Sequence, residues 1–316
     1  MTQPASPAVA VMGAGAVGCF YGGMLALAGN AVTLIGRPQH VDAVKRDGLA
    51  IERAGRRDVV RVEASTDAQA VSSANVVLVC VKSPATADAA REMKPYLRPD
   101  SVVVSLQNGV ENAQRIAEVV DQVVLAAVVW VGTYMEAPGV VRHSGGGNLV
   151  LGVPRDCASR PGAAARVRQV AAMFERAGVS CPVADDVDAA LWSKLVVNCA
   201  FNAVSALGRA RYGRMAAEPA IRELMETVVR ESVAVARANG IALDEQEMIA
   251  TAWRTAERLS SQYSSTAQDI LRGKHTEIDA LNGHVAQRGK ALGVDTPVNR
   301  ALHALVKLRE AGDDLA

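Results

Sequence analysis

The stretch VMGAGAVG, residues 11–18, decides the fold. It follows a short apolar run and opens the helix-like segment AVGCFYGGMLALAG, so Gly13, Gly15 and Gly18 lie between a strand and a helix. The first glycine permits the turn, the second lets the backbone approach a pyrophosphate, and the third lets helix and strand pack closely. Free N–H groups at the helix start then bind the anion. The stretch predicts a dinucleotide-binding βαβ unit; the alternative is a glycine-rich turn that binds no ligand.

The first half of the chain alternates between short apolar runs and helix-like segments. The runs NVVLVCVKS, from residue 75, and SVVVSLQNG, from residue 101, are rich in valine and apolar on both faces, as in a parallel sheet covered by helices. Segments with helical periodicity lie near Ala85–Pro95 and Glu111–Val119. We therefore expect a Rossmann-type, doubly wound α/β domain over residues 1–184.

Three further stretches complete the expected architecture. Residues 51–65 predict a small hairpin or an irregular insertion, and residues 123–152 predict antiparallel strands with turns at Ala137–Gly139 and Gly145–Gly147. After residue 184 strand-like runs almost disappear, and segments with helical periodicity end at glycine or turn residues. Residues 185–316 are therefore expected to form an all-α domain.

The composition excludes several classes of function. With 316 residues, the chain is long enough for two domains that each bury a core. Half of the residues are hydrophobic and 21% are charged, which is typical of a globular protein. The formal net charge is only +1 and aromatic residues make up 3%, so neither a basic field nor a base-stacking platform for nucleic acid is expected.

The cysteines, the histidines and the N-terminus indicate a cytoplasmic protein without a metal site. Five cysteines form no C-x-x-C pair, and most lie in apolar runs, as in proteins of a reducing compartment. The N-terminus has no basic region before an apolar core, and no apolar run reaches 18 residues, so neither a secretory signal nor a membrane partner is expected. Each histidine is interpreted as structural or exposed, since none has a metal-ligand spacing: His40, His143, His275, His284 and His303.

Three polar residues follow the ends of predicted strands, where the ligand crevice of an open α/β sheet lies. Arg37 follows Gly36 in LIGRPQH, at the place where a carboxylate would bind the ribose of NAD. An arginine there favours the 2′-phosphate of NADP, the alternative being a solvated surface charge. Lys82 is expected near the cofactor phosphate or ribose, and Asn108 near the nicotinamide and the substrate, unless Asn108 and Gly109 form only a turn.

A polar stripe interrupts the apolar segment LWSKLVVNCAFNAV, residues 191–204. Lys194, Asn198 and Asn202 are each four residues apart and therefore share one face of a helix. A solvent-facing stripe is the simplest interpretation, because lysine is rarely buried without a partner. The alternative is the wall of a cleft, where a buried ammonium would lose solvation and have its pKa lowered.

These motifs occur together in an order that resembles the ketopantoate reductase (2-dehydropantoate 2-reductase) family. The shared pattern is GAGAVG, V-K-S, L-Q-N-G, then W-x-K-x-x-x-N-x-x-x-N, and finally S-S-x-x-Q-D-x-x-x-G-K-x-T-E-I-D-x-x-N-G. The resemblance runs from about residue 8 to residue 310, and the long C-terminal block is its most specific part.

The resemblance implies NADPH-dependent reduction of 2-dehydropantoate to pantoate, in pantothenate biosynthesis. It implies a second domain for binding the small 2-oxo acid and for dimerisation, although the sequence leaves a homodimer open. By position in the motifs, Lys194 matches the catalytic acid and Glu277 a substrate-binding and catalytic carboxylate. The residues matching substrate contacts are Asn108, Asn198, Asn202 and Ser265, and those matching cofactor contacts include Arg37, Lys82 and Asn108.

One departure from the family pattern bears on the substrate. The family often has Asn–Gly after the lysine helix, where this chain has Tyr212 before Gly213. The alternatives are therefore a reductase of another branched 2-oxo acid, or a non-catalytic NADP-binding regulator. The joint presence of the lysine, the asparagines, the serine and the glutamate argues against the regulator, which needs none of this chemistry.

Overall fold

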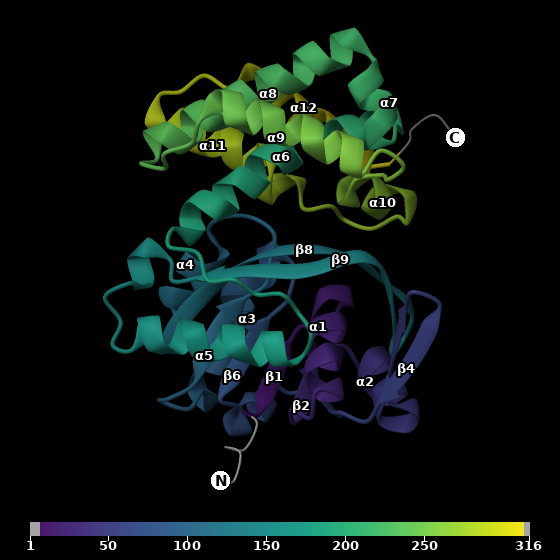
Figure 1. Cartoon of the computed structure of the whole chain (residues 1–316), viewed down its shortest axis with the longest axis vertical. Coiled ribbons are helices and arrows are strands. Elements are labelled where there is room, and N and C mark those ends of the chain that lie inside the picture. Colours follow the sequence, from purple (N-terminus) through teal and green to yellow (C-terminus); the bar gives the residue numbers. More distant parts are fainter. Residues whose placement is uncertain (1–6, 313–316) are drawn as a thin grey trace. The chain divides into compact units, whose positions relative to one another are not determined.

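The computed structural model describes residues 7–312 and divides into two compact units. The division falls between Val187 and Asp188. The N-terminal unit contains every strand of the described chain, and the C-terminal unit is helical (Figure 1). The expected fold, a Rossmann-type α/β domain followed by an all-α domain, is confirmed.

The N-terminal unit is built on one nine-stranded sheet in the order β4-β3-β9-β8-β7-β6-β1-β2-β5. The six strands from β8 to β5 are parallel, β9 pairs antiparallel with β8, and β3 and β4 form the expected hairpin beside β9. The strands are β1 (Val9–Met12), β2 (Val32–Ile35), β3 (Leu49–Arg53), β4 (Arg56–Val60), β5 (Glu63–Ser65), β6 (Val76–Val79), β7 (Val102–Ser105), β8 (Val123–Ala137) and β9 (Val140–Gly152).

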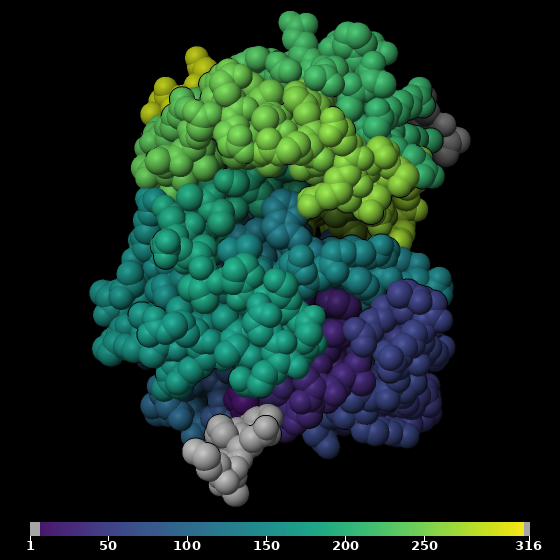
Figure 2. Space-filling model, in the orientation of Figure 1, coloured from purple at the N-terminus to yellow at the C-terminus, as the bar shows by residue number. Residues whose placement is uncertain are grey.

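Helices cover both faces of this sheet, which explains why β1 and β6, near its centre, are apolar at every position. One face carries Val11 and Leu78 and packs against α1 and α5, where Tyr21 meets Phe174 edge to face with ring centroids 6.0 Å apart. The segments of these two helices lie side by side in the space-filling view (Figure 2). The helices of this unit are α1 (Ala16–Leu27), α2 (Pro38–Asp47), α3 (Thr86–Met93), α4 (Asn112–Ala117) and α5 (Ala163–Arg176).

One predicted turn is wrong. Ala137–Gly139 does connect β8 to β9, but Gly145–Gly147 lies inside β9. The pairing runs from Trp130 with Asn148 to Val131 with Gly146, so Gly147 is an extra residue in a β-bulge. All three glycines have positive φ, and a Cβ on Gly146 would lie 2.4 Å from the Trp130 carbonyl oxygen. The glycines therefore permit a bulge rather than a reversal of the chain.

The C-terminal unit packs its helices around α6 (Val187–Gly208). The inner side chains of α6, among them Leu195, Val196 and Phe201, are at most 2% exposed. This helix is long and apolar enough to cross a membrane, but most of its apolar window is buried within the protein, as in a core helix. The other helices are α7 (Tyr212–Ala217), α8 (Pro219–Ala238), α9 (Glu245–Arg258), α10 (Ser265–Leu271), α11 (Asn282–Leu292) and α12 (Pro297–Glu310).

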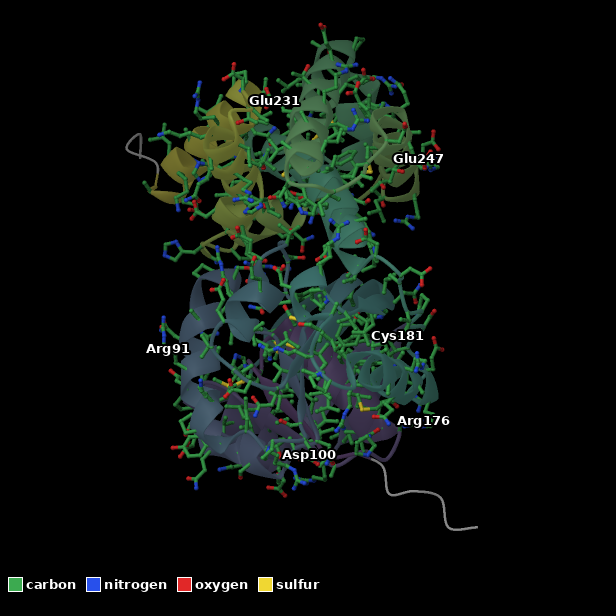
Figure 3. All side chains as sticks on the ribbon, turned by 90° about the vertical axis from the view of Figure 1, so that its left-hand side faces the viewer. Arg91, Asp100, Arg176, Cys181, Glu231 and Glu247 are labelled. Carbon is green, nitrogen blue, oxygen red and sulfur yellow. The ribbon has the colours of Figure 1, made fainter. Side chains whose placement is uncertain are left out.

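A buried carboxylate joins two of these helices. Glu231, on α8, lies among the helices of the C-terminal unit (Figure 3) and is 9% exposed. It accepts the backbone N–H groups of Val298 and Asn299, each at 2.9 Å, at the start of α12. A negative charge at a helix N-terminus is favourable, so Glu231 fixes where α12 begins.

We predict that Gly18→Ala lowers the free energy of unfolding by about 1–3 kcal/mol, the usual cost of overpacking. A Cβ at Gly18 would lie 2.3 Å from the Gly13 carbonyl oxygen, which is backbone and cannot rotate away. Urea denaturation measures the change. Gly15→Ala is the matched control, because no atom lies within 4 Å of its new Cβ. Equal stability of both variants would contradict the close approach of helix and strand.

Candidate active site

In the N-terminal unit, the glycine loop lies where three parallel strands end. The strand order reverses between β1 and β6, which is the place where open α/β sheets bind ligands. Gly13 has φ +109°, and a Cβ there would lie 2.7 Å from the Val81 nitrogen, next to β6. The N–H groups of Gly13 and Ala14 donate to the Ile35 carbonyl of β2, at 3.0 and 2.9 Å. The loop is therefore bonded to one neighbouring strand and packed against the other.

The loop leaves room for an anion at the start of α1. Gly15 is the N-cap, it provides no side-chain acceptor, and the first turn contains no acidic residue. The N–H groups that begin a helix need acceptors from outside it. Because no atom lies within 4 Å of a Cβ position at Gly15, the backbone is open to close approach by a ligand. A pyrophosphate fits these requirements.

Arg37 lies beside this loop. It is exposed, follows the end of β2 and occupies the N-cap position of α2. Gly36 makes the placement possible, since a Cβ there would lie 2.7 Å from the Cβ of Ala14. Arg37 is therefore the second residue after the point where β2 contacts the glycine loop, since Ile35 bonds the loop and Gly36 packs against Ala14.

Lys82 and Asn108 lie in the loops after β6 and β7, and a buried polar network joins these loops. Lys82 is exposed and Asn108 is half-buried. The Asn108 carbonyl accepts hydrogen bonds from Ser83 Oγ at 2.8 Å and from Asn112 Nδ2 at 2.6 Å. Thr86, at 0% exposure, continues the network with its Oγ1 2.9 Å from Asn112 Oδ1. A fully satisfied network of this kind rigidifies its surroundings.

This network was not predicted as part of the site. Ser83 and Gln107 belong to the V-K-S and L-Q-N-G motifs. The hydrogen-bond partners of single hydroxyl and amide side chains cannot be predicted from the sequence. Gln107 Nε2 donates to the Val81 carbonyl at 2.9 Å, which ties the β7 loop to the β6 loop. Gly109 has φ +98°, and the chain bends over residues 108–111.

In the C-terminal unit, the polar stripe lies on α6 as its spacing predicts. Lys194 and Asn198 are half-buried, and Asn202 is 1% exposed, so the stripe is not an ordinary solvent-facing one. Asn202 Nδ2 donates to the Oγ of Ser265 at 3.4 Å, joining α6 to the start of α10.

The two adjacent serines have different roles. Ser264 is the N-cap of α10, and its Oγ accepts the Ala267 N–H at 3.1 Å. The same hydroxyl donates to the Asn202 carbonyl at 3.2 Å, which anchors α10 to α6. Ser264 therefore positions the backbone, and Ser265 presents its hydroxyl beside the Asn202 amide.

Glu277 is half-buried and precedes the short 3₁₀ segment Ile278–Ala280. It therefore lies in the connection before α11, rather than on a helix. Loss of solvation lowers the pKa of the Lys194 ammonium to about 8, and the negative charge of Glu277 opposes this shift. The two groups thus interact electrostatically within one unit. At neutral pH Lys194 is mostly protonated, which suits a general acid.

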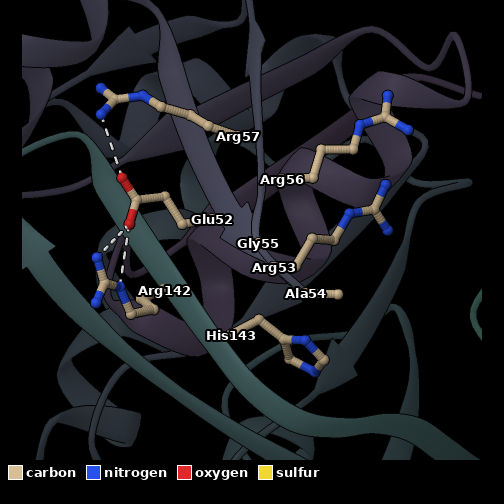
Figure 4. A pocket seen from close by; sticks show the side chains of 8 residues that line it. All are labelled: Glu52, Arg53, Ala54, Gly55, Arg56, Arg57, Arg142 and His143. Carbon is tan, nitrogen blue, oxygen red and sulfur yellow. Dashed lines mark hydrogen bonds and ion pairs between the residues drawn. The ribbon is translucent and has the colours of Figure 1, made fainter.

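A separate charged pocket lies at the β3–β4 hairpin, and none of the predicted site residues lines it (Figure 4). Glu52 pairs with Arg57 and Arg142, and Asp58 pairs with Arg53 and Arg56. The four arginines outnumber the two carboxylates, so these pairs leave a net positive charge at the pocket. Within residues 7–312, no three His, Cys, Asp or Glu side chains form a group that could hold a metal ion.

Comparison with known proteins gives one consistent result. The family model "Ketopantoate reductase PanE/ApbA" matches residues 9–156, and the model of its C-terminal part matches residues 186–310. A 2-dehydropantoate 2-reductase of Halobacterium salinarum is 37% identical over 305 residues, which cover 96% of this chain and 98% of that protein.

Solved structures agree with the sequence comparison. A PanE/ApbA family ketopantoate reductase from Ralstonia eutropha is 48% identical, with a TM-score of 0.88, and the match covers 96% of this chain and 98% of that one. The ternary structure of D-mandelate dehydrogenase with NADH and anilino(oxo)acetate is 25% identical, with a TM-score of 0.89 and the same coverage.

We predict that Glu277→Gln lowers the pKa of Lys194 further below about 8, because it removes the charge that stabilises the ammonium. The pH dependence of acetylation of Lys194, followed by peptide mass spectrometry in the free protein, measures this pKa. Acetylation of Lys290, an exposed residue of α11, serves as the internal reference. An unchanged titration of Lys194 would show that Glu277 does not act on it.

Proposed function

The chain belongs to the ketopantoate reductase family, and we propose that it reduces 2-dehydropantoate (ketopantoate) to pantoate, with NADPH as hydride donor, in pantothenate biosynthesis. The chain is accordingly an oxidoreductase of a Rossmann-type fold. The observation that supports the assignment most strongly is the grouping in one unit of a depressed-pKa lysine, a carboxylate that acts on it, and an Asn–Ser pair.

The proposed cofactor site uses residues of the N-terminal unit. The N–H groups at Gly15 and the start of α1 bind the pyrophosphate, and Gly13 and Gly18 allow the loop to adopt its shape. Arg37 pairs with the 2′-phosphate that distinguishes NADPH from NADH. Lys82 and Asn108 contact the rest of the cofactor. Bound NADPH supplies the hydride that reduces C2 of the oxo acid.

Lys194 provides the proton in the proposed mechanism. As C2 is reduced, negative charge develops on the carbonyl oxygen, and the Lys194 ammonium stabilises this charge and donates a proton to the oxygen. The product is the 2-hydroxy acid and Lys194 is left as a neutral amine. A pKa of about 8 makes the Lys194 ammonium a better proton donor than that of an ordinary lysine.

The remaining polar residues orient the substrate. Asn198 and Asn202 donate amide hydrogens to the substrate hydroxyl and carboxylate, and Ser265 adds a hydroxyl beside Asn202. Glu277 accepts a hydrogen bond from the distal hydroxyl of the substrate and keeps Lys194 protonated. The family resemblance assigns a substrate contact to Asn108 as well. Fixed orientation of this kind supplies the proximity part of catalysis.

A second candidate is the reduction of another 2-oxo acid, including aromatic ones. The similarity to D-mandelate dehydrogenase supports it, and so does the departure at Tyr212. The Tyr212 ring is 8% exposed and stacks on Phe201, with centroids 4.4 Å apart, directly before Asn202 in the chain. The cytoplasmic location and the homodimer remain predictions, as do the contacts of each site residue.

We predict that the purified protein oxidises NADPH with ketopantoate, and that Lys194→Ala lowers kcat by about 10²–10⁴-fold, the usual contribution of a general acid. Binding of NADPH, measured by fluorescence titration, should not change, because the proposed cofactor residues lie in the other unit. Lys290→Ala is the control for loss of a lysine. Near-normal turnover by Lys194→Ala would refute its role.

The same assay separates the candidate substrates. Turnover with ketopantoate well above that with phenylglyoxylate, the oxo acid of mandelate, supports the pantoate assignment. Faster turnover with phenylglyoxylate would show that the substrate is an aromatic oxo acid, reduced by the same mechanism.

We predict that Arg37→Ala raises the KM for NADPH about tenfold or more and leaves the KM for NADH nearly unchanged, because only NADPH carries the phosphate. Steady-state kinetics with both cofactors test this. Arg46→Ala provides a matched control, since Arg46 is an exposed arginine of α2, the helix that Arg37 precedes, and pairs with Asp47. Equal effects on the two cofactors would show that Arg37 is a solvated surface charge that does not bind the 2′-phosphate.

A further inference from the structure

The backbone that carries Glu277 is tied to the end of α12. Glu310 is in the last turn of that helix, and its Oε1 accepts the Thr276 N–H at 2.6 Å. The Glu310 side chain is only 7% exposed, so this bond is shielded from water. The Thr276 hydroxyl in turn accepts the Ile278 N–H at 3.2 Å. The residue before Glu277 is thus held by a buried carboxylate that lies 34 positions later in the chain.

The other side of Glu277 is tied to the same helix. Asp279 Oδ1 lies 2.6 Å from His303 Nε2, and Asp279 Oδ2 accepts a hydrogen bond from Lys307 Nζ at 2.9 Å. The buried Ile278, at 0% exposure, fixes the backbone between the two attachments. Glu277 is therefore flanked by Thr276 and Asp279, and α12 binds both.

Lys307 connects the two attachments. Its Nζ also lies 3.1 Å from Glu310 Oε2, so one ammonium bridges the two carboxylates. The set formed by His303, Lys307 and Glu310 is called the α12 clasp below. Gly283 makes room for it, because a Cβ there would lie 2.8 Å from His303 Nε2. Gly283, the last residue of the C-terminal sequence motif, is thus a glycine because a side chain there would collide with His303.

The charges of Asp279, Glu310 and Lys307 support one another. Loss of solvation raises the pKa of Asp279, but hydrogen bonds from His303 and Lys307 outweigh it and the pKa is lowered. Loss of solvation likewise opposes ionisation of Glu310, but hydrogen bonds from Thr276 and then Lys307 leave its pKa lowered. Hydrogen bonds to Asp279 and Glu310 raise the pKa of Lys307. All three groups are therefore charged at neutral pH.

We propose that the α12 clasp is a positioning device for Glu277, holding its carboxylate at the distance from Lys194 that substrate binding and proton donation require. The role of Glu277 rests on the proposed function, whereas the clasp itself rests on the contacts above. Because Glu277 stabilises the Lys194 ammonium, release of the segment separates the two charges and Lys194 loses its proton more readily. A purely structural clasp would change only the overall stability.

Glu310→Ala tests the proposal, because it removes the acceptor of the Thr276 N–H and one partner of Lys307. We expect kcat/KM for ketopantoate to fall about 10- to 100-fold, the scale of a small misplacement of a catalytic group, chiefly through KM for the oxo acid. The KM for NADPH should stay the same. Acetylation of Lys194 in the free protein should show a lower pKa than in wild type.

Three variants complete the experiment. Glu310→Gln keeps an oxygen that accepts the Thr276 N–H, and it should restore most of the lost kcat/KM. Lys307→Met removes the bridging ammonium and should shift the same readouts in the same direction even where Glu310→Ala does not fold. Arg230→Met is the matched control: Arg230 is 45% exposed, against 44% for Lys307, and pairs with Glu226 on α8. Its readouts should equal wild type.

The outcomes separate this proposal from the proposed function. Folded Glu310→Ala and Lys307→Met with wild-type KM and wild-type Lys194 titration would overturn the positioning role. A wild-type protein that does not reduce ketopantoate, together with a lowered Lys194 pKa in Glu310→Ala, would overturn the substrate assignment and support the clasp.

Discussion

The ammonium group of Lys194 lies on a helix whose inner side chains are mostly apolar, and its charge has to be stabilised within the C-terminal unit. An apolar environment disfavours the charged form of lysine, and Lys194 accordingly has a pKa near 8. A nearby negative charge limits this loss, and Glu277 supplies it. A carboxylate can do so only if its own backbone is fixed. The structure fixes it through Thr276 and Asp279, which α12 holds on either side.

Much of the fold could be predicted from local sequence, and the errors have physical causes. The glycine loop and the valine-rich strands are visible because backbone sterics and burial on both faces restrict the residues allowed there. The turn predicted at Gly145–Gly147 was wrong because positive-φ glycines serve a β-bulge as well as a turn. The helices α2 and α5 were not predicted, although Pro38 at the first position of α2 is a recognisable start signal.

The candidate site was predictable only in part. Spacing alone placed Lys194, Asn198 and Asn202 on one helical face, since helical periodicity is a local property. The partnership with Glu277 could not be obtained from spacing, because 83 positions separate the two residues in the sequence, and it came from the family resemblance. Nothing in the sequence indicated the α12 clasp. Surface-type residues such as Lys307 and Glu310 recur on most helices, and only the folded chain shows that Glu310 reaches the Thr276 N–H.

The departure at Tyr212 can be placed in the same framework. Its ring packs on Phe201 within the unit, and its backbone N–H donates to the Gln262 carbonyl at 3.1 Å, while the N–H of Gly213 donates to Ser260 at 2.9 Å. These bonds hold the segment that precedes Ser265. Tyr212 therefore contacts α6 through its ring and the segment before Ser265 through its backbone. A different side chain at position 212 would alter the packing on Phe201, the residue before Asn202, and we expect this position to act on substrate choice through that contact.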